Sequence, residues 1–239
     1  MPKARAQAAE QVLSGQPGAA ARRWLGPLTI AAFLLFGLDT WLIAVQPLLP
    51  FDRPVELFVQ SFPWGPFVYA MDFTNRLSGY LQLGLALVAI AMMFVVERRA
   101  GWLMAVGSLA SVFDNVVKLS FARHRPTADL VKILDPTTGY SYPSGHAVFF
   151  TWLAFMLAAA IAPRLSVPGR VVAWSLAVLV ILTACLARVW AGVHWPSDVL
   201  GGFLLGLGWS AFVLWIPERF LPAPSWSWFQ RLRRKRVAA

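Results

Sequence analysis

Three short groups of polar residues interrupt an otherwise apolar chain, and their residue types suit chemistry on an anion. The groups are Lys118 with Arg125 and Pro126, then Pro143-Ser144-Gly145-His146, then Arg188 with His194 and Asp198. The lysine and the two arginines supply three cations, which fits the charge-assisted hydrogen bonds that a dianionic phosphate requires. Each cation taken alone also fits an ordinary anchor that reaches the lipid headgroups, so the prediction of an anion site rests on the three groups together.

Ser144 and Gly145 stand where an apolar helix is expected to begin. Their backbone N–H groups and the positive end of the helix dipole are then expected to point at phosphate oxygens. The missing side chain of Gly145 would let the phosphate approach closely. The alternative is that Pro143-Ser144-Gly145 forms only a turn and a helix cap.

Two histidines belong to these groups, and neutral imidazole serves both nucleophilic attack and proton transfer near neutral pH. His194 is followed four positions later by Asp198, whose carboxylate would fix the tautomer of the ring and raise its nucleophilicity. His146 has no such partner nearby in sequence and is predicted to be the proton donor. Asp114 lies four residues before Lys118, and this spacing predicts a pair on one helix face that aims the lysine.

The elements that position these residues are predicted to be membrane helices. Hydrophobic residues make up 58% of the 239 residues and charged residues only 13%, against about 25% charged residues in soluble domains. The apolar residues fall in blocks near the ~20 residues that span a bilayer core. The fold class is therefore all-α, a polytopic membrane protein with six transmembrane helices. The spans are expected at 27–48, 78–97, 101–121, 145–163, 171–191 and 197–217, with an interfacial segment at 51–76.

The distribution of basic residues predicts the orientation. With six spans, one side receives 14 of the 21 lysines and arginines, and the three polar groups lie at the helix ends on the other side. Cytoplasmic loops are enriched in basic residues, so the polar groups are expected to face the periplasm or exterior of a cell (inner) membrane. This gives basic cytoplasmic tails at 1–23 and 221–239 around a membrane domain at 24–220. A secretory signal after Arg22-Arg23 is the weaker interpretation, because apolar residues resume beyond Asp39.

The remaining composition limits partners and cofactors. A net charge of +10 does not predict nucleic-acid binding, because the basic residues lie at the ends of apolar blocks and in the tail. Cys185 is the single cysteine, so no intramolecular disulfide is possible. The histidines and carboxylates show no compact ligand spacing, and no metal or other cofactor is expected. His124 is interpreted as a solvated loop residue. Asp39, inside the first span, is either functional or bonded to a polar neighbour within the bundle.

Taken in order, the patterns Lys-x6-Arg-Pro, Pro-Ser-Gly-His and Arg-x5-His-x3-Asp resemble those of the type 2 phosphatidic acid phosphatase (PAP2) superfamily, which includes the vanadium haloperoxidases. The matched stretch runs from Lys118 to Asp198 and covers 81 of the 239 residues. The resemblance implies that His194 forms a phosphohistidine supported by Asp198, and that His146 donates a proton. It also implies that five residues hold the phosphoryl group: Lys118, Arg125, Ser144, Gly145 and Arg188. One departure is Ala187, where the family usually has a serine.

The resemblance implies a lipid phosphatase whose partners are the bilayer and a lipid phosphate. The substrates it suggests are undecaprenyl diphosphate, phosphatidylglycerol phosphate and phosphatidic acid. Two other classes stay open. A vanadium haloperoxidase would hold vanadate in the same pocket, but six spans and the missing soluble helical body argue against it. A non-catalytic lipid carrier would need neither a nucleophile nor a proton donor, so the paired histidines argue against that class.

Overall fold

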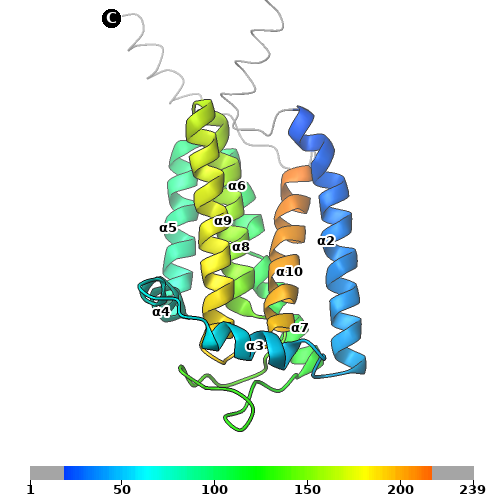
Figure 1. Ribbon diagram of the computed structural model, residues 1–239. Helices are drawn as coiled ribbons and strands as arrows, with labels where there is room; N and C mark the ends of the chain where they lie inside the picture. Colours follow the sequence, from blue (N-terminus) through cyan, green and yellow to red (C-terminus); the bar gives the residue numbers. More distant parts are fainter. Residues whose placement is uncertain (1–18, 217–239) are drawn as a thin grey trace, which may run out of the picture.

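The computed structural model describes residues 19–216, which form a bundle of roughly parallel and antiparallel helices (Figure 1). In chain order the elements are α2 (Ala19–Val45), α3 (Asp52–Ser61), α4 (Phe67–Arg76), α5 (Tyr80–Val96), α6 (Arg98–Gly107), α7 (Ala110–Phe121), α8 (Gly145–Ile161), the 3-10 turn η1 (Ala162–Arg164), α9 (Val167–Trp190) and α10 (Pro196–Trp215). The basic tails expected at 1–23 and 221–239 lie outside the described residues, except for 19–23, which belong to α2.

Five helical segments of the described chain are long and apolar enough to cross a membrane. They are Arg23–Val45, Arg98–Phe121, Gly145–Arg164, Val167–Trp190 and Pro196–Trp215, and α5 makes a sixth candidate when it is combined with α4. Large apolar side chains on the outside, such as Leu34, Val95 and Val171, are exposed, as expected for contact with lipid tails. No strand occurs in residues 19–216, so the prediction of an all-α membrane protein is confirmed, with five or six spans.

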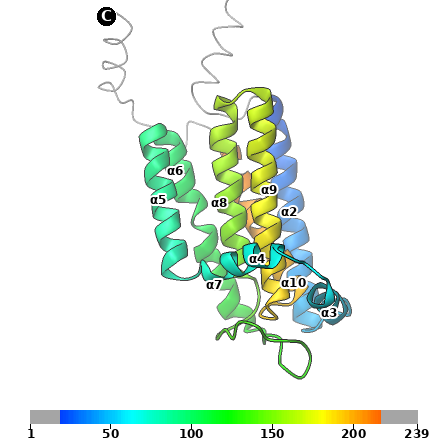
Figure 2. The same ribbon diagram turned by 60° about the vertical axis from the view of Figure 1, so that its left-hand side comes forward.

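The predicted interfacial segment 51–76 forms two ten-residue helices. Both α3 and α4 lie across the same end of the bundle as loop 122–144 (Figures 1 and 2). α3 packs on α9 and α10, and α4 packs on α9. The chain then bends by 89° into α5, and Gly79 supports this bend with a positive φ of 54°, which glycine adopts without steric cost.

Glycines on α10 bring α8 close to its backbone. A methyl group added to Gly202 would lie 2.5 Å from the carbonyl oxygen of Ser144, and one added to Gly206 would lie 2.9 Å from the Thr151 Cβ. Small residues permit this close helix packing in membranes. The start of α8 is thereby fixed against the first turn of α10, which brings the second and third polar groups of the sequence together.

Two of the expected helix bounds differ from the structure. The span expected at 101–121 is divided into α6 and α7 by a short turn at Ser108 and Leu109. The span expected at 27–48 corresponds to α2, which already includes residues 19–26 and ends at Val45. Apolar blocks mark the part of a helix inside the bilayer, whereas hydrogen bonding continues the helix through the basic residues before it.

Candidate active site

The three polar groups come together at the end of the bundle where α3, α4 and loop 122–144 lie (Figure 1). Lys118 is in the last turn of α7, Arg188 is in the last turn of α9, and His194 lies between α9 and α10. Their charges converge, because Arg125, Arg188 and Lys118 all act electrostatically on the His194 ring. Residues separated by up to 80 positions therefore form one site.

His194 is almost fully buried, with 2% of its surface exposed. Its Nε2 lies 3.1 Å from Nη1 of Arg125. A guanidinium group can only donate, so Nε2 must accept and the ring proton must be on Nδ1. Burial, together with the charges of Arg125 and Arg188, holds the pKa of His194 well below its usual range. The ring is therefore neutral at neutral pH, with the lone pair of Nε2 directed at the Arg125 guanidinium.

Asp198 lies beside the other ring nitrogen but does not form the hydrogen bond expected from the sequence. Its Oδ2 is 3.7 Å from His194 Nδ1, beyond hydrogen-bonding distance. The carboxylate instead accepts hydrogen bonds from Arg123, from the Ser141 hydroxyl and, at 2.8 Å, from the backbone N–H of Trp195. These donors hold the carboxylate on the Nδ1 side of the ring, where its charge can stabilise a cationic imidazole.

Arg125 is anchored on three carbonyl groups. It donates to Gly139 at 3.0 Å, to Tyr140 at 3.1 Å and to Val193 at 2.6 Å. With His194 these contacts use four of the five guanidinium N–H groups. One N–H of Nη2 remains for a ligand. The Arg125 Nη1 N–H that now points at His194 Nε2 would also become available if that nitrogen bonded to phosphorus.

Lys118 forms the expected contact with Asp114, and both lie against the start of α8. Its Nζ is 3.2 Å from each carboxylate oxygen. A methyl group added to Gly145 would lie 2.9 Å from Asp114 Oδ2 and 3.4 Å from Nζ. The structure thus gives a further reason for glycine here: its missing side chain makes room for the lysine and its carboxylate partner, in addition to the approach of a phosphate.

A mutant cycle tests whether this pair acts as a unit. We expect Asp114→Asn to lower kcat/KM roughly tenfold, because Lys118 loses the partner that limits its rotamers. Lys118→Met is expected to cost more, because it removes one of the three cations predicted to bind phosphate. The double variant should lose little beyond Lys118→Met alone. Additive losses in initial rate would show that the two residues act independently.

Ser144 contributes to the site differently from the sequence-based expectation. Its backbone N–H donates to the carbonyl of Asp198 at 2.9 Å, so it cannot also bind a phosphate oxygen. This bond exists because α8 starts directly against α10. The Ser144 hydroxyl remains, along with the N–H groups of the first turn of α8, which begins at Gly145.

Several buried polar atoms of the three groups have no hydrogen-bond partner within residues 19–216. They are Ser144 Oγ, His146 Nε2, Arg188 Nε and His194 Nδ1. Buried polar atoms in folded proteins are usually paired. Ser144 Oγ and Arg188 Nε can donate to a ligand, and together with the three cations they favour an anionic one.

Arg123 was not identified from the sequence, where it is one loop cation among several, yet it is at the centre of a buried network. The side chain is 4% exposed. It donates to Asp52 Oδ2 at 2.7 Å, to Ser197 Oγ at 2.8 Å, to the Pro47 carbonyl at 2.7 Å and to Asp198. Arg123 thereby links the first residue of α3 to the carboxylate beside the candidate nucleophile.

Two more residues of the interfacial helices face the site. Glu56 on α3 is fully buried, and burial, followed by the charges of Asp198 and Asp52, raises the pKa of its carboxyl group to about 9. It is therefore neutral at neutral pH. Asn75 on α4 accepts a hydrogen bond from Arg188 Nη1 at 2.9 Å. The sequence did not indicate that Glu56 and Asn75 belong to the site. Both lie in a segment that was interpreted only as interfacial.

The other polar residues singled out from the sequence have simple surroundings. Asp39 is 5% exposed on α2, and a methyl group on Gly201 would lie 2.8 Å from its Oδ2 and 2.7 Å from the Tyr142 hydroxyl. It therefore faces the bundle beside a polar neighbour. His124 is exposed. Within the described residues no group of three or more His, Cys, Asp or Glu side chains could hold a metal ion.

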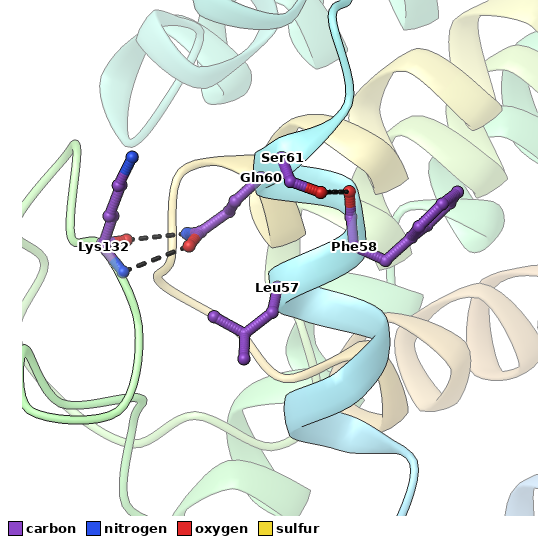
Figure 3. Close-up of a pocket in the computed structure, with 5 residues that line it drawn as sticks. All are labelled: Leu57, Phe58, Gln60, Ser61 and Lys132. Carbon is purple, nitrogen blue, oxygen red and sulfur yellow. Dashed lines mark hydrogen bonds between the residues drawn. The ribbon is translucent and has the colours of Figure 1, made fainter.

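A shallow pocket of about 410 Å³ lies beside the site, between α3 and loop 122–144 (Figure 3). It is lined by Leu57, Phe58, Gln60, Ser61 and Lys132. The Gln60 amide donates to the Lys132 carbonyl at 2.7 Å and accepts from the Lys132 N–H at 3.1 Å. These bonds fasten the loop to α3. A side chain on Gly192 would collide with the same carbonyl, and its φ of 72° also favours glycine.

Known proteins share both the sequence patterns and the fold. The family model of the PAP2 superfamily matches residues 98–222. An undecaprenyl-diphosphatase from Sulfolobus acidocaldarius is 33% identical over 129 residues, which cover 52% of this chain and 58% of that protein. A decaprenylphosphoryl-5-phosphoribose phosphatase from Mycobacterium tuberculosis is 31% identical over 137 residues, which cover 56% of this chain and 69% of that protein.

A solved structure gives the same picture of the fold. The crystal structure of a transmembrane PAP2-type phosphatidylglycerolphosphate phosphatase from Bacillus subtilis matches with a TM-score of 0.65 and 23% identity, over 77% of this chain and 93% of that one. The match to the Sulfolobus protein spans less than two thirds of its length. The family model, by contrast, covers more than half of the present chain and includes all three polar groups. The chain belongs to the PAP2 superfamily.

Proposed function

We propose that this protein is a membrane lipid phosphatase that transfers a phosphoryl group first to His194 and then to water. The observation that carries the proposal is the state of His194: a buried, neutral imidazole whose Nε2 accepts from Arg125. A neutral nucleophile beside cations that bind its target is the arrangement that covalent phosphoryl transfer needs.

The proposed mechanism gives each residue of the site one role. Lys118, Arg125 and Arg188 bind the phosphate oxygens, and His194 Nε2 attacks the phosphorus while the bond to the leaving oxygen breaks. His146 gives a proton to that oxygen, which departs on the lipid. Asp198 stabilises the positive charge of the phosphorylated ring. Water then attacks the phosphorus, His146 takes its proton, inorganic phosphate leaves, and the His194 ring is neutral again.

The substrate class follows from the location of the site and from the relatives. The site lies at one end of apolar helices, where a lipid headgroup can reach it. The names of two relatives describe phosphatases of polyprenyl compounds, undecaprenyl diphosphate and decaprenylphosphoryl-5-phosphoribose. These names favour a polyprenyl phosphate or diphosphate, with undecaprenyl diphosphate first. Phosphatidylglycerol phosphate and phosphatidic acid are the competing substrates.

Phosphate release by the purified protein in detergent tests this function. We expect turnover of undecaprenyl diphosphate in the presence of EDTA, because three side-chain cations supply the charge that a metal ion would otherwise provide. Phosphatidylglycerol phosphate and phosphatidic acid, assayed in parallel, rank the substrates. Release from none of the three lipids would reject the phosphatase function, and activity lost in EDTA but restored by a divalent ion would reject the metal-independent mechanism.

The orientation can be tested with single cysteines in a Cys185→Ala background. We propose that the site faces the periplasm or cell exterior, because it lies opposite the side with 14 of the 21 basic residues. Thr138, exposed in loop 122–144, should then be labelled as Thr138→Cys by an impermeant maleimide in intact spheroplasts. Ser166, exposed at the opposite helix ends, gives the matched control Ser166→Cys, which should react only after lysis. The reverse pattern would invert the topology.

A further inference from the structure

Asn75, in the last turn of α4, connects the interfacial helices with a phosphate-binding arginine. Its Nδ2 donates to the carbonyl of Ala187 at 3.1 Å, and its Oδ1 accepts from Nη1 of Arg188 at 2.9 Å. The side chain is 6% exposed, so water does not compete for these bonds. One carboxamide therefore contacts two consecutive residues at the end of α9.

The other contacts of Arg188 are too weak to orient it. Its second partner is Asp135, at 3.9 Å, whose side chain is 53% exposed. Exposed ion pairs contribute only about 0–1 kcal/mol. The Nε of Arg188 is buried and has no partner in the described part of the chain. Asn75 is thus the short contact that sets the direction of the guanidinium and leaves Nε available for an anion.

The partner at short distance, Asn75, is neutral, whereas the carboxylate of Asp135 is 3.9 Å away and half exposed; a neutral partner matters for binding an anion. A carboxylate at this position would also accept the hydrogen bond, but it would offset the positive charge that attracts phosphate. A carboxamide of the same shape orients the guanidinium without adding a negative charge beside the ligand.

We propose that Asn75 is a positioning residue of this site, which aims Arg188 through its side chain. The inference rests on the proposed phosphatase function and adds that α4, outside the three sequence groups, sets the affinity for the phosphoryl group. Nothing in the motif pattern from Lys118 to Asp198 includes this helix.

Two variants and one matched control test the proposal. Asn75→Asp keeps the shape and the acceptor but adds a negative charge. Asn75→Ala removes both bonds. Thr74→Val is the control, because Thr74 is the buried neighbour whose hydroxyl bonds only within α4, to the Met71 carbonyl at 2.8 Å. The readouts are kcat, KM, the inhibition constant for inorganic phosphate, and thermal unfolding in detergent.

We expect Asn75→Asp to weaken inhibition by inorganic phosphate at least about tenfold and to raise KM more than it lowers kcat. Asn75→Ala should lower kcat/KM roughly 10- to 100-fold. Thr74→Val should change neither kcat/KM nor the inhibition constant for inorganic phosphate. Wild-type phosphate affinity in a folded Asn75→Asp variant would overturn the proposal. So would loss of folding in both Asn75 variants with Thr74→Val intact, since the residue would then be structural. An inactive wild-type protein would instead reject the phosphatase function itself.

Discussion

Replacing His194 by alanine is expected to lower phosphate release at least a thousandfold, on the order of the losses seen when a nucleophile is removed. The remaining site would still hold Lys118, Arg125 and Arg188, so binding of inorganic phosphate should persist. The imidazole is buried but belongs to a turn between α9 and α10 rather than to the helix core. Expression and membrane insertion are therefore expected to be retained.

His124→Ala is the matched control for this variant. His124 lies in the same loop as Arg125 but is exposed, and its removal should leave the rate near the wild-type value. Initial rates on a short-chain lipid phosphate in detergent make the comparison. If His194→Ala kept a near wild-type rate, the covalent mechanism would be wrong.

Arg123→Gln is expected to have the second large effect, on stability as well as on activity. Arg123 lies between the buried carboxylates of Asp52 and Asp198. Removing one partner from a buried ion network costs about 3–5 kcal/mol, because the remaining charges stay buried without compensation. For a chain of this size that corresponds to a fall in unfolding temperature on the order of 10 °C. Activity should fall too, because Asp198 loses a donor that holds it beside His194.

A second substitution distinguishes this explanation from a general defect. Asp52→Asn in the Arg123→Gln background removes one uncompensated carboxylate, and part of the lost thermal stability should return. Arg53→Gln removes the same charge from an exposed neighbour on α3 and should change the unfolding temperature by little. A double variant whose destabilisation equals the sum of the two single losses would show that Arg123 and Asp52 are not coupled.

The parts of the site that were predictable from the sequence are those encoded by local spacing. Long apolar blocks indicated the spans, and the four-residue spacing of Asp114 and Lys118 indicated their contact. The same spacing placed Asp198 near His194 but could not show that Arg123, Ser141 and Trp195 occupy its carboxylate. Which donors reach an acceptor depends on how separate helices pack.

The residues missed by sequence analysis make their contacts over long separations. Arg123 and Asp52 are 71 positions apart, and Arg188 and Asn75 are 113 apart. A single sequence contains no sign of such pairs, because a buried arginine and a surface arginine look alike in it. The interfacial segment was recognised from its composition, but composition did not show that two of its three prolines mark helix starts. Pro54 lies in the first turn of α3 and Pro66 is the N-cap of α4, where proline is tolerated.

The phosphohistidine is the central claim, and trapping it is the most direct test. Protein turning over undecaprenyl diphosphate labelled in its terminal phosphate would be stopped rapidly with alkali, and the label on the chain would be measured. The mechanism predicts label that is stable to alkali and labile to acid, present on the wild-type protein and absent from His194→Ala. Turnover without any such label, or label that persists in His194→Ala, would contradict the mechanism.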